Sequence, residues 1–229
     1  MIPEIYHSTL ADLAGPKNTK PLSDKDKTKK LYHTRQLPIP LPSPRVAIVG
    51  SRKASPKGTE AAYQISQYLA EHHILVASGL AEGIDTTAHK AAIEAKGQTL
   101  AVLATPLDQT YPQKNYGLQQ VIIQNHLAVS QFPPNTPIRP ENFLLRNQTL
   151  AQLTHTSIII EAQPQSGTLN HARHTLKLNH PLYIYQPLNQ NQPWTKPLLA
   201  AGATLFEDPK EILEKLPRNT TTNGLTSSL

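Results

Sequence analysis

Short apolar runs that alternate with helix-like segments constrain the fold of this sequence more than any other feature. The runs lie at 45–50, 74–78, 99–104, 127–132, 157–162 and 181–186. Segments with helical character lie between and after them, at 59–73, 86–97, 116–126, 141–155, 167–177 and 209–216. Buried strands that alternate with helices form parallel sheets covered on both faces. The sequence therefore predicts an α/β protein with a mostly parallel sheet between two layers of helices.

The two ends of the chain differ from this pattern. Residues 1–44 contain a lysine-rich polar tract and then prolines at 38, 40, 42 and 44, which is typical of solvated and extended chain. We expect a flexible basic, proline-rich segment over 1–44, a core domain over 45–217 and a disordered tail over 218–229. Deleting residues 1–30 is expected to leave the core untouched.

Composition excludes several classes of protein. The chain has no cysteine, so disulfides, thiolate chemistry and cysteine-based zinc sites are excluded. No run approaches 18 apolar residues, and the first residues do not follow the layout of a signal peptide. A soluble, cytoplasmic protein with no membrane partner is the default expectation.

The net charge of +6 is unevenly distributed. Residues 1–44 hold seven Lys or Arg and four Asp or Glu, whereas residues 45–217 hold 14 and 12. The predicted core is nearly balanced, so charge alone gives only weak support for a polyanionic partner.

The loops after the predicted strands are rich in small and hydrogen-bonding residues. They are found at 50–55, 78–85, 105–115 and 161–168. In parallel sheets ligands bind at the carboxyl ends of the strands, where glycines admit a close ligand and helix N-termini attract anions. Tight turns and helix caps use the same residue types, so each loop taken alone also fits a purely structural role. Neither a G-x-G-x-x-G nor a P-loop fingerprint is present.

Five stretches of the chain together resemble a known family. They are VAIVGSRKAS, VASGLAEGIDTTAHKAA, LAVLATPLDQTYPQKN, FLLRNQTLAQL and IIIEAQPQSGTLNHA. In this order, over about residues 45–216, they resemble the DNA-processing protein A (DprA/Smf) family. The resemblance implies an extended Rossmann-like three-layer sandwich that binds single-stranded DNA and loads a RecA-type recombinase during natural transformation. It also implies a homodimer, no defined catalytic reaction, no cofactor and no metal.

The resemblance also implies which residues bind DNA phosphates. They are Gly50, Ser51, Arg52, Lys53, Ser78, Gly79, Gly83, Asp85, Lys114, Asn115, Arg146, Asn147, Ser166 and Gly167. Asp85 is expected to be the N-cap of the following helix. Glu82 and Gln148 stand where family members usually have arginine, and two lost phosphate contacts would flatten the salt dependence of binding by about two units of slope.

Other polar residues have both functional and structural interpretations. His89 lies four residues after Asp85, a spacing that allows a hydrogen bond. His171 and His174 have a metal-chelating spacing but no evident third ligand. Glu161 is either a general base or a residue that holds a loop in place, the second being favoured. Tyr111 either stacks on a base or closes a turn, and its polar surroundings favour stacking.

Three functions compete at this point. The leading hypothesis is a non-catalytic protein that binds single-stranded DNA. The second is a nucleotide sensor or nucleotide hydrolase of a related Rossmann-like family, and the third is an interaction module whose groove no longer binds. The deciding observation is the placement of Arg52, Lys114 and Arg146, which the first hypothesis requires to share one pocket.

Overall fold

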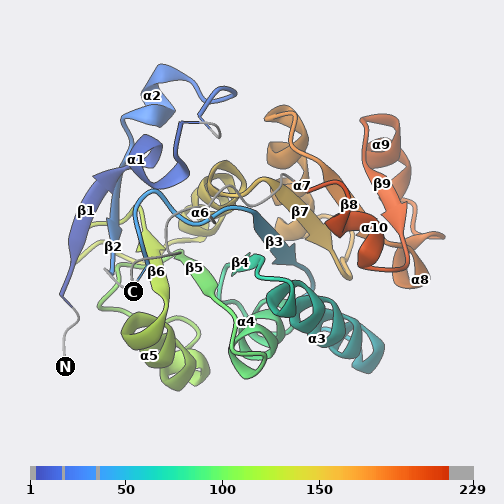
Figure 1. Cartoon of the computed structure of the whole chain (residues 1–229), viewed down its shortest axis with the longest axis horizontal. Helices are drawn as coiled ribbons and strands as arrows, with labels where there is room; N and C mark the ends of the chain where they lie inside the picture. The colour runs from blue at the N-terminus through green and yellow to red at the C-terminus, as the bar shows by residue number, and fades with distance from the viewer. Residues whose placement is uncertain (1–3, 17–18, 35–36, 217–229) are drawn as a thin grey trace, which may run out of the picture.

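A nine-stranded sheet runs through the computed structural model, which describes residues 4–16, 19–34 and 37–216 (Figure 1). Its order is β1 (Tyr6–Thr9), β2 (Lys30–His33), β6 (Leu127–Ser130), β5 (Thr99–Leu103), β4 (Leu75–Ser78), β3 (Arg45–Val49), β7 (Thr156–Ile159), β8 (Leu182–Tyr185) and β9 (Thr204–Phe206). All pairs from β6 to β9 are parallel, and the β1–β2 and β2–β6 pairs are antiparallel. The predicted mostly parallel sheet is confirmed.

The order of the strands places a switch point beside β3. The chain steps from β3 through β4 and β5 to β6, and then returns to the other side of β3 to form β7, β8 and β9. Loops that leave β3 and β7 therefore diverge to opposite faces of the sheet. In open α/β sheets this divergence opens a crevice at the carboxyl ends of the two strands.

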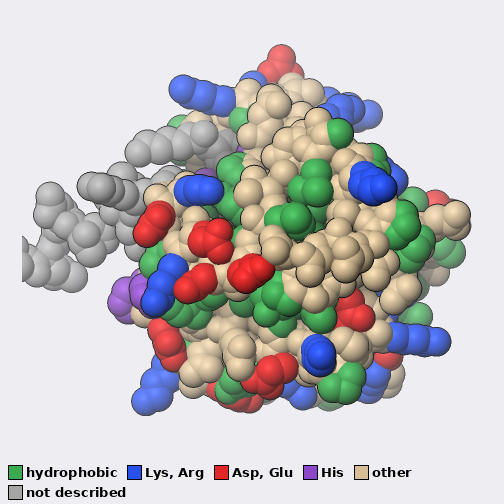
Figure 2. Space-filling model, turned by 90° about the vertical axis from the view of Figure 1, so that its right-hand side faces the viewer, with side chains coloured by type: hydrophobic (Ala, Val, Ile, Leu, Met, Phe, Trp, Pro, Cys, Tyr) green, Lys and Arg blue, Asp and Glu red, His purple; other side chains and the backbone are tan. Residues whose placement is uncertain are grey.

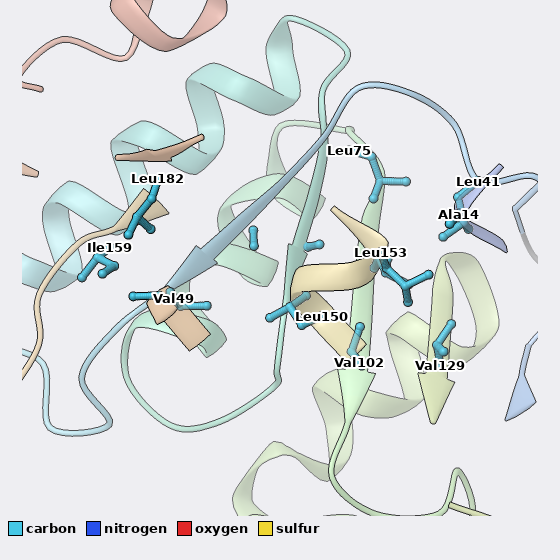
Figure 3. Packing of buried hydrophobic residues seen from close by; sticks show 14 of the residues in the cluster. Ala14, Leu41, Val49, Leu75, Val102, Val129, Leu150, Leu153, Ile159 and Leu182 are labelled. Carbon is cyan, nitrogen blue, oxygen red and sulfur yellow. The ribbon is translucent and has the colours of Figure 1, made fainter. Parts of the chain in front are cut away.

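Helices cover both faces of the sheet (Figure 1). They are α1 (Leu10–Ala14), α2 (Asp24–Lys27), α3 (Pro56–Glu71), α4 (Ile84–Glu94), the 3-10 helix η1 (Gln113–Asn115), α5 (Tyr116–Asn125), α6 (Pro140–Leu153), α7 (Gly167–Lys177), α8 (Gln186–Asn189), α9 (Thr195–Ala200) and α10 (Lys210–Leu213). Side chains alternate along β3, so that Val46 and Ile48 pack under α3 and α4 while Ala47 and Val49 join the core of the opposite face (Figure 3). The predicted three-layer arrangement is confirmed.

The expectation of a flexible segment over 1–44 is wrong for its described residues. β1 and β2 form an antiparallel pair that extends the sheet beyond β6, and Leu10 and Leu13 of α1 are fully buried in the core. The polar composition is misleading because the leucines of this segment are few but buried: Leu10, Leu13, Leu22, Leu31, Leu37 and Leu41. A deletion of residues 1–30 would therefore remove part of the core.

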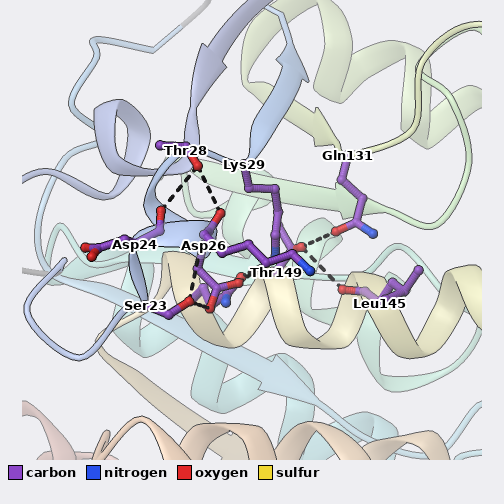
Figure 4. Close-up of polar contacts among 10 residues, drawn as sticks. Ser23, Asp24, Asp26, Thr28, Lys29, Gln131, Leu145 and Thr149 are labelled. Atoms are coloured by element: carbon purple, nitrogen blue, oxygen red, sulfur yellow. Dashed lines mark hydrogen bonds and ion pairs between the residues drawn. The ribbon is translucent and has the colours of Figure 1, made fainter.

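The lysine-rich tract packs against α6 (Figure 4). Ser23 caps α2 by accepting a hydrogen bond from the amide of Asp26, and Asp26 forms an ion pair with Lys29 at 3.4 Å. Lys29 Nζ also donates to Gln152 Oε1 at 2.8 Å. Asp26 and Lys29, which the sequence pattern predicts to be solvated, thus make contacts within the protein.

Arg45 attaches the N-terminal segment to the sheet. Its side chain is 1% exposed, and its guanidinium donates to the carbonyl oxygens of Ala14, Leu41 and Leu153. Burial lowers the pKa of Arg45 to about 10. A charge that makes so many hydrogen bonds to carbonyl groups fixes three chain segments relative to one another.

At the other end of the sheet, β9 pairs with β8 and was not predicted from the sequence. The predicted tail over 218–229 lies outside the described residues. No helix within the described residues combines the length and apolar character that a membrane crossing requires.

Candidate functional site

A cavity of about 820 Å³ opens at the carboxyl ends of β3 and β7, at the switch point of the sheet. Nine of the predicted site residues line it: Gly50, Ser51, Arg52, Lys53, Asp85, Arg146, Asn147, Ser166 and Gly167. Gly79 lines an adjoining cavity of about 50 Å³, which shares Arg52, Ala81, Tyr111 and Phe143 with the larger one. Most of the predicted site residues therefore line cavities at the strand ends, and their role in binding stays a prediction.

The loop after β3 is fixed by its backbone. The amide of Ser51 donates to the carbonyl of Glu161 at 2.7 Å, and the carbonyl of Ser51 accepts from the amide of Ile84 at 3.2 Å. A Cβ atom at Gly50 would overlap Ile84 and the Glu161 backbone, so only glycine fits there. This frame presents the exposed side chains of Arg52 and Lys53 at the cavity mouth.

Four predicted site residues line neither cavity, and three of them, Ser78, Gly83 and Asn115, have structural roles. Ser78 is fully buried and its hydroxyl donates to the carbonyl of Ile48 at 2.6 Å. Gly83 has φ of +73° and leaves no room for a Cβ beside the Ser51 carbonyl. Asn115 is buried and its amide donates to Leu80 O and Thr86 Oγ1, both at 2.9 Å. The pattern marked these positions correctly as special, but the reason is loop geometry.

Asp85 is not the N-cap that the sequence suggested. The N-cap of α4 is Gly83, and the buried Asp85 carboxylate accepts from the amides of Gly79 at 3.2 Å and Ala81 at 3.4 Å. The hydrogen bond between Asp85 and His89 that the spacing allows is not formed: His89 Nδ1 lies 2.7 Å from Thr99 Oγ1, and Nε2 has no hydrogen-bond partner among the described residues. Burial raises the pKa of Asp85, against the opposing charge of Arg146.

Arg146 lines the cavity from its floor. Its guanidinium is buried and donates to the carbonyl of Gly79, and its Nε donates to Asn147 Oδ1 at 2.9 Å. A Cβ at Gly79 would overlap this guanidinium, so the glycine makes room for the arginine. Asp85 and Arg146 therefore hold the Gly79–Ala81 loop from two sides, and the guanidinium of Arg146, predicted to bind phosphate, already makes hydrogen bonds within the protein.

Lys114 does not line either cavity, contrary to the prediction. Its ammonium group is paired with Glu82 Oε2 at 2.6 Å, and Glu82 lines the smaller cavity. Three cations were expected to share one pocket. Arg52 and Arg146 line the larger cavity, whereas Lys114 lines neither cavity and is paired with Glu82, which lines the smaller one.

Aromatic and aliphatic side chains form the mouth of the cavity. The Arg52 guanidinium lies over the Phe143 ring at 4.9 Å from its centroid, and Tyr111 meets the same ring edge-on at 5.4 Å. Tyr111 is 49% exposed, and Ile138 and Leu144 are also exposed. A cation and flat apolar surfaces thus stand together at the entrance.

Phe143 and Arg139 line the cavity but are not among the predicted site residues, although the sequence carries a signal for Phe143. Phe143, Arg146, Asn147 and Leu150 recur at the spacing of one helical face on α6, and all four line the cavity. Arg139 precedes Pro140 at the start of α6 and is exposed on the cavity wall. Extending the face around Arg146 by one turn would have identified the aromatic residue.

The N-terminus of α7 lies at the cavity wall, and the free amides of a helix N-terminus attract anions. Ser166 is its N-cap, and Gly167 and Thr168 follow in the first turn, all three on the cavity wall. The Ser166 hydroxyl is shielded from solvent and has no hydrogen-bond partner among the described residues. The N-terminus of α3, in contrast, already has an acid, because Glu161 accepts from the amide and hydroxyl of Ser55. The favoured interpretation of Glu161, a residue that holds a loop in place, agrees with this contact.

His171 lies at the cavity wall but its ring nitrogens are both engaged. Nδ1 donates to the carbonyl of Asn147 at 3.1 Å, which leaves Nε2 to accept from the Ser157 hydroxyl at 2.9 Å. Burial lowers the pKa of His171 to about 4, so the ring is neutral at neutral pH. Within the described residues, no group of three or more metal-ligating side chains is formed around it or elsewhere.

A family model described as DNA recombination-mediator protein A matches residues 9–217. The match spans most of the chain, including α1 and β2 of the N-terminal segment. The chain belongs to this family, which is the DprA/Smf family of the relatives that follow.

Two relatives illustrate the extent of the similarity. The DNA processing protein DprA of Streptococcus pneumoniae is 41% identical over 126 residues, which cover 55% of this chain and 44% of the relative. Protein Smf of Escherichia coli is 34% identical over 178 residues, which cover 75% of this chain and 47% of the relative. The matched part is less than half the length of either relative.

Solved structures agree with the fold. The crystal structure of DprA from Streptococcus pneumoniae matches with a TM-score of 0.80 and 28% identity, covering 95% of this chain and 76% of that chain. DNA processing protein A from Helicobacter pylori, described for its single-stranded DNA binding mode, matches with a TM-score of 0.77 and 27% identity, covering 94% and 97%. The molybdenum cofactor binding protein of Rippkaea orientalis, with a TM-score of 0.55 and 18% identity over 76% of this chain and 94% of that chain, shares the fold alone.

Proposed function

We propose that the cavity beside β3 and β7 binds single-stranded DNA, and that the protein acts in DNA recombination without catalysing a reaction. The observation that carries this proposal is the Arg52 guanidinium over the Phe143 ring at the cavity mouth. Phosphate requires a cation, and an unpaired base offers a flat face to an aromatic ring. In a duplex those faces are stacked and hidden, so this combination favours a single strand.

The surrounding charges support a polyanion at this place. Arg52, Lys53 and Arg139 are exposed on the cavity wall, and the helix terminus at Ser166 adds donors for phosphate. The face of the molecule at the β9 end of the sheet differs, because its acidic and basic side chains are interspersed (Figure 2). A strand of DNA therefore meets its complementary charge at the cavity and not on that face.

The acid and the histidine that line the cavity, Asp85 and His171, are already hydrogen-bonded within the protein, which favours a binding function over catalysis. Asp85 accepts hydrogen bonds from two backbone amides, and both nitrogens of His171 are engaged within the protein. A general base needs an available lone pair directed at the reacting proton. Glu161, the other acid considered, is bonded to Ser55.

Membership of the recombination-mediator family extends the proposal to partners. We propose that the protein binds a RecA-type recombinase, forms a homodimer, is located in the cytoplasm and acts in natural transformation. Pull-down of the recombinase on DNA-coated beads and light scattering of the purified protein test the first two.

The nucleotide-sensor or hydrolase hypothesis has one observation in its favour. A cavity of about 820 Å³ with a helix terminus on its wall is large enough for a mononucleotide. Thermal-shift measurements with mononucleotides distinguish the two: a rise of several degrees with a nucleotide and none with oligothymidine would favour the sensor.

Fluorescence polarisation tests the DNA proposal. Labelled oligothymidine is compared with a blunt duplex of equal length at low and at moderate salt. We expect salt-sensitive binding of the single strand that is tighter than binding of the duplex. Absence of salt-sensitive binding to the single strand at low ionic strength would rule the proposal out.

A further inference from the structure

The Glu82–Lys114 ion pair lies beside the proposed DNA site. Glu82 belongs to the loop between β4 and α4 and lines the smaller cavity together with Arg52, Tyr111 and Phe143. Its carboxylate lies 2.6 Å from Lys114 Nζ, and the two side chains are 38% and 61% exposed. An acid and a cation thus neutralise each other at the entrance where a phosphate would arrive.

The backbone beneath this pair is fixed. Asn115, the neighbour of Lys114, donates from its side chain to Leu80 O and to Thr86 Oγ1. Leu80 and Thr86 lie on either side of Glu82 in the chain, so the Asn115 side chain links the two segments independently of the ion pair. The Glu82 side chain can therefore leave Lys114 by rotating, without any movement of the loop.

The exposure of the pair makes it displaceable. Solvent screens an ion pair between half-exposed side chains, and such pairs contribute little to folding. A DNA phosphate offers Lys114 the same charge as the Glu82 carboxylate, and it does so as one of several phosphates on a strand already attracted by Arg52.

We propose that Glu82 is an internal competitor of DNA phosphate for Lys114, so that its carboxylate limits the affinity of the site for single-stranded DNA. This inference rests on the proposed function. A bound strand either displaces Glu82 from Lys114 or binds without that lysine, and in both cases the acid lowers affinity and the salt dependence of binding.

Charge-neutral variants test the competition. E82Q keeps the size of the side chain and frees Lys114, and E71Q removes an acid from the far end of α3 as a matched control for net charge. At about 50 mM salt, E82Q is expected to bind oligothymidine on the order of threefold to tenfold more tightly, with a salt slope steeper by about 0.7, as one regained phosphate contact implies. E71Q is expected to differ little from the wild type.

A double-mutant cycle identifies Lys114 as the residue that is released. K114Q should weaken the E82Q variant by about threefold or more, and the wild type by less than about twofold, because only the freed lysine makes the full contact. Thermal melting of each variant confirms that the fold is intact.

The possible failures are distinguishable. If wild type binds oligothymidine but E82Q behaves as E71Q does, or K114Q has equal effects in both backgrounds, the competition is overturned and the DNA proposal stands. If neither wild type nor E82Q shows salt-sensitive binding, both are overturned.

Discussion

Two arginines at opposite ends of β3 show how differently one residue type is used in this protein. Arg45, at the amino end, is buried and donates to carbonyl groups from α1, from the segment before β3 and from the end of α6. Arg52 follows the carboxyl end, is exposed, and has an aromatic ring as its neighbour. Seven positions separate a residue that holds segments together from one that is available to a ligand.

The difference lies in how each charge is satisfied. Buried carbonyl oxygens replace the water around Arg45, so its removal would leave those acceptors without donors. No hydrogen bond or ion pair to the Arg52 guanidinium is formed within the described residues, and the ring below it leaves its donors available. The amino end of the strand therefore contributes to stability, and the carboxyl end presents a cation whose donors are available to the proposed ligand.

Replacing Arg45 should have the largest effect of the changes considered. In R45M the carbonyls of Ala14, Leu41 and Leu153 lose their donor, and we expect a loss of about 3 kcal/mol in the free energy of unfolding. For a chain of this size this corresponds to a melting temperature lower by about 6–12 °C. R52M serves as the matched control. Equal melting temperatures for the two variants would show that Arg45 contributes no more to stability than Arg52 does.

Gly79 tests the floor of the cavity at the carboxyl end. In G79A the new methyl group occupies the space of the Arg146 guanidinium, which must give up its contact with the loop, at an expected cost of about 2 kcal/mol. G117A, where a Cβ meets no atom within 4 Å, is the control. If G79A were as stable in urea as G117A, the contact between the Arg146 guanidinium and the Gly79 carbonyl would not contribute to stability.

His155 gives the amino end of the sheet a dependence on pH. It lies beside Arg45, whose amide donates to its Nδ1 at 3.0 Å, and burial lowers its pKa to about 3. Between an unfolded pKa of about 6.5 and this value the unfolded chain binds more protons, so stability falls as pH falls.

The expected loss in the free energy of unfolding between pH 7 and pH 5 is about 2 kcal/mol from His155, with further losses from His89 and His171, whose pKa values burial lowers in the same direction. Urea unfolding at the two pH values measures it, and H155Q should lose less than wild type does. A stability that does not change between pH 7 and pH 5 would contradict this assignment.

The sequence predicted the sheet well because its signal is local. Six strands of mostly aliphatic residues are readable one at a time, and the glycines and serines that follow them mark the strand ends. Residues 1–44 were misjudged because their order depends on distant partners: Leu13 is buried by other segments, and Lys29 is held by Gln152, 123 positions away. Composition carries no information about such contacts.

The candidate site was predictable as a region but not residue by residue. Ser78, Lys114 and Asn115 belong to the same set of family stretches as Gly50 and Arg52, yet hydrogen bonds and an ion pair direct their side chains elsewhere. A motif records that a position is constrained and not which constraint applies. The role proposed for Glu82 likewise depends on its ion pair with Lys114, a contact between two separate loops.

The most direct test of the central claim compares R52A with K90A in oligothymidine binding at two salt concentrations. Lys90 is an exposed cation on α4 and does not line either cavity, so K90A removes the same charge away from the site. We expect R52A to lose about 1–3 kcal/mol of binding free energy, with a shallower salt dependence, and K90A to change little. Equal losses in the two variants, or no loss in R52A, would show that the cavity mouth beside β3 is not where DNA binds.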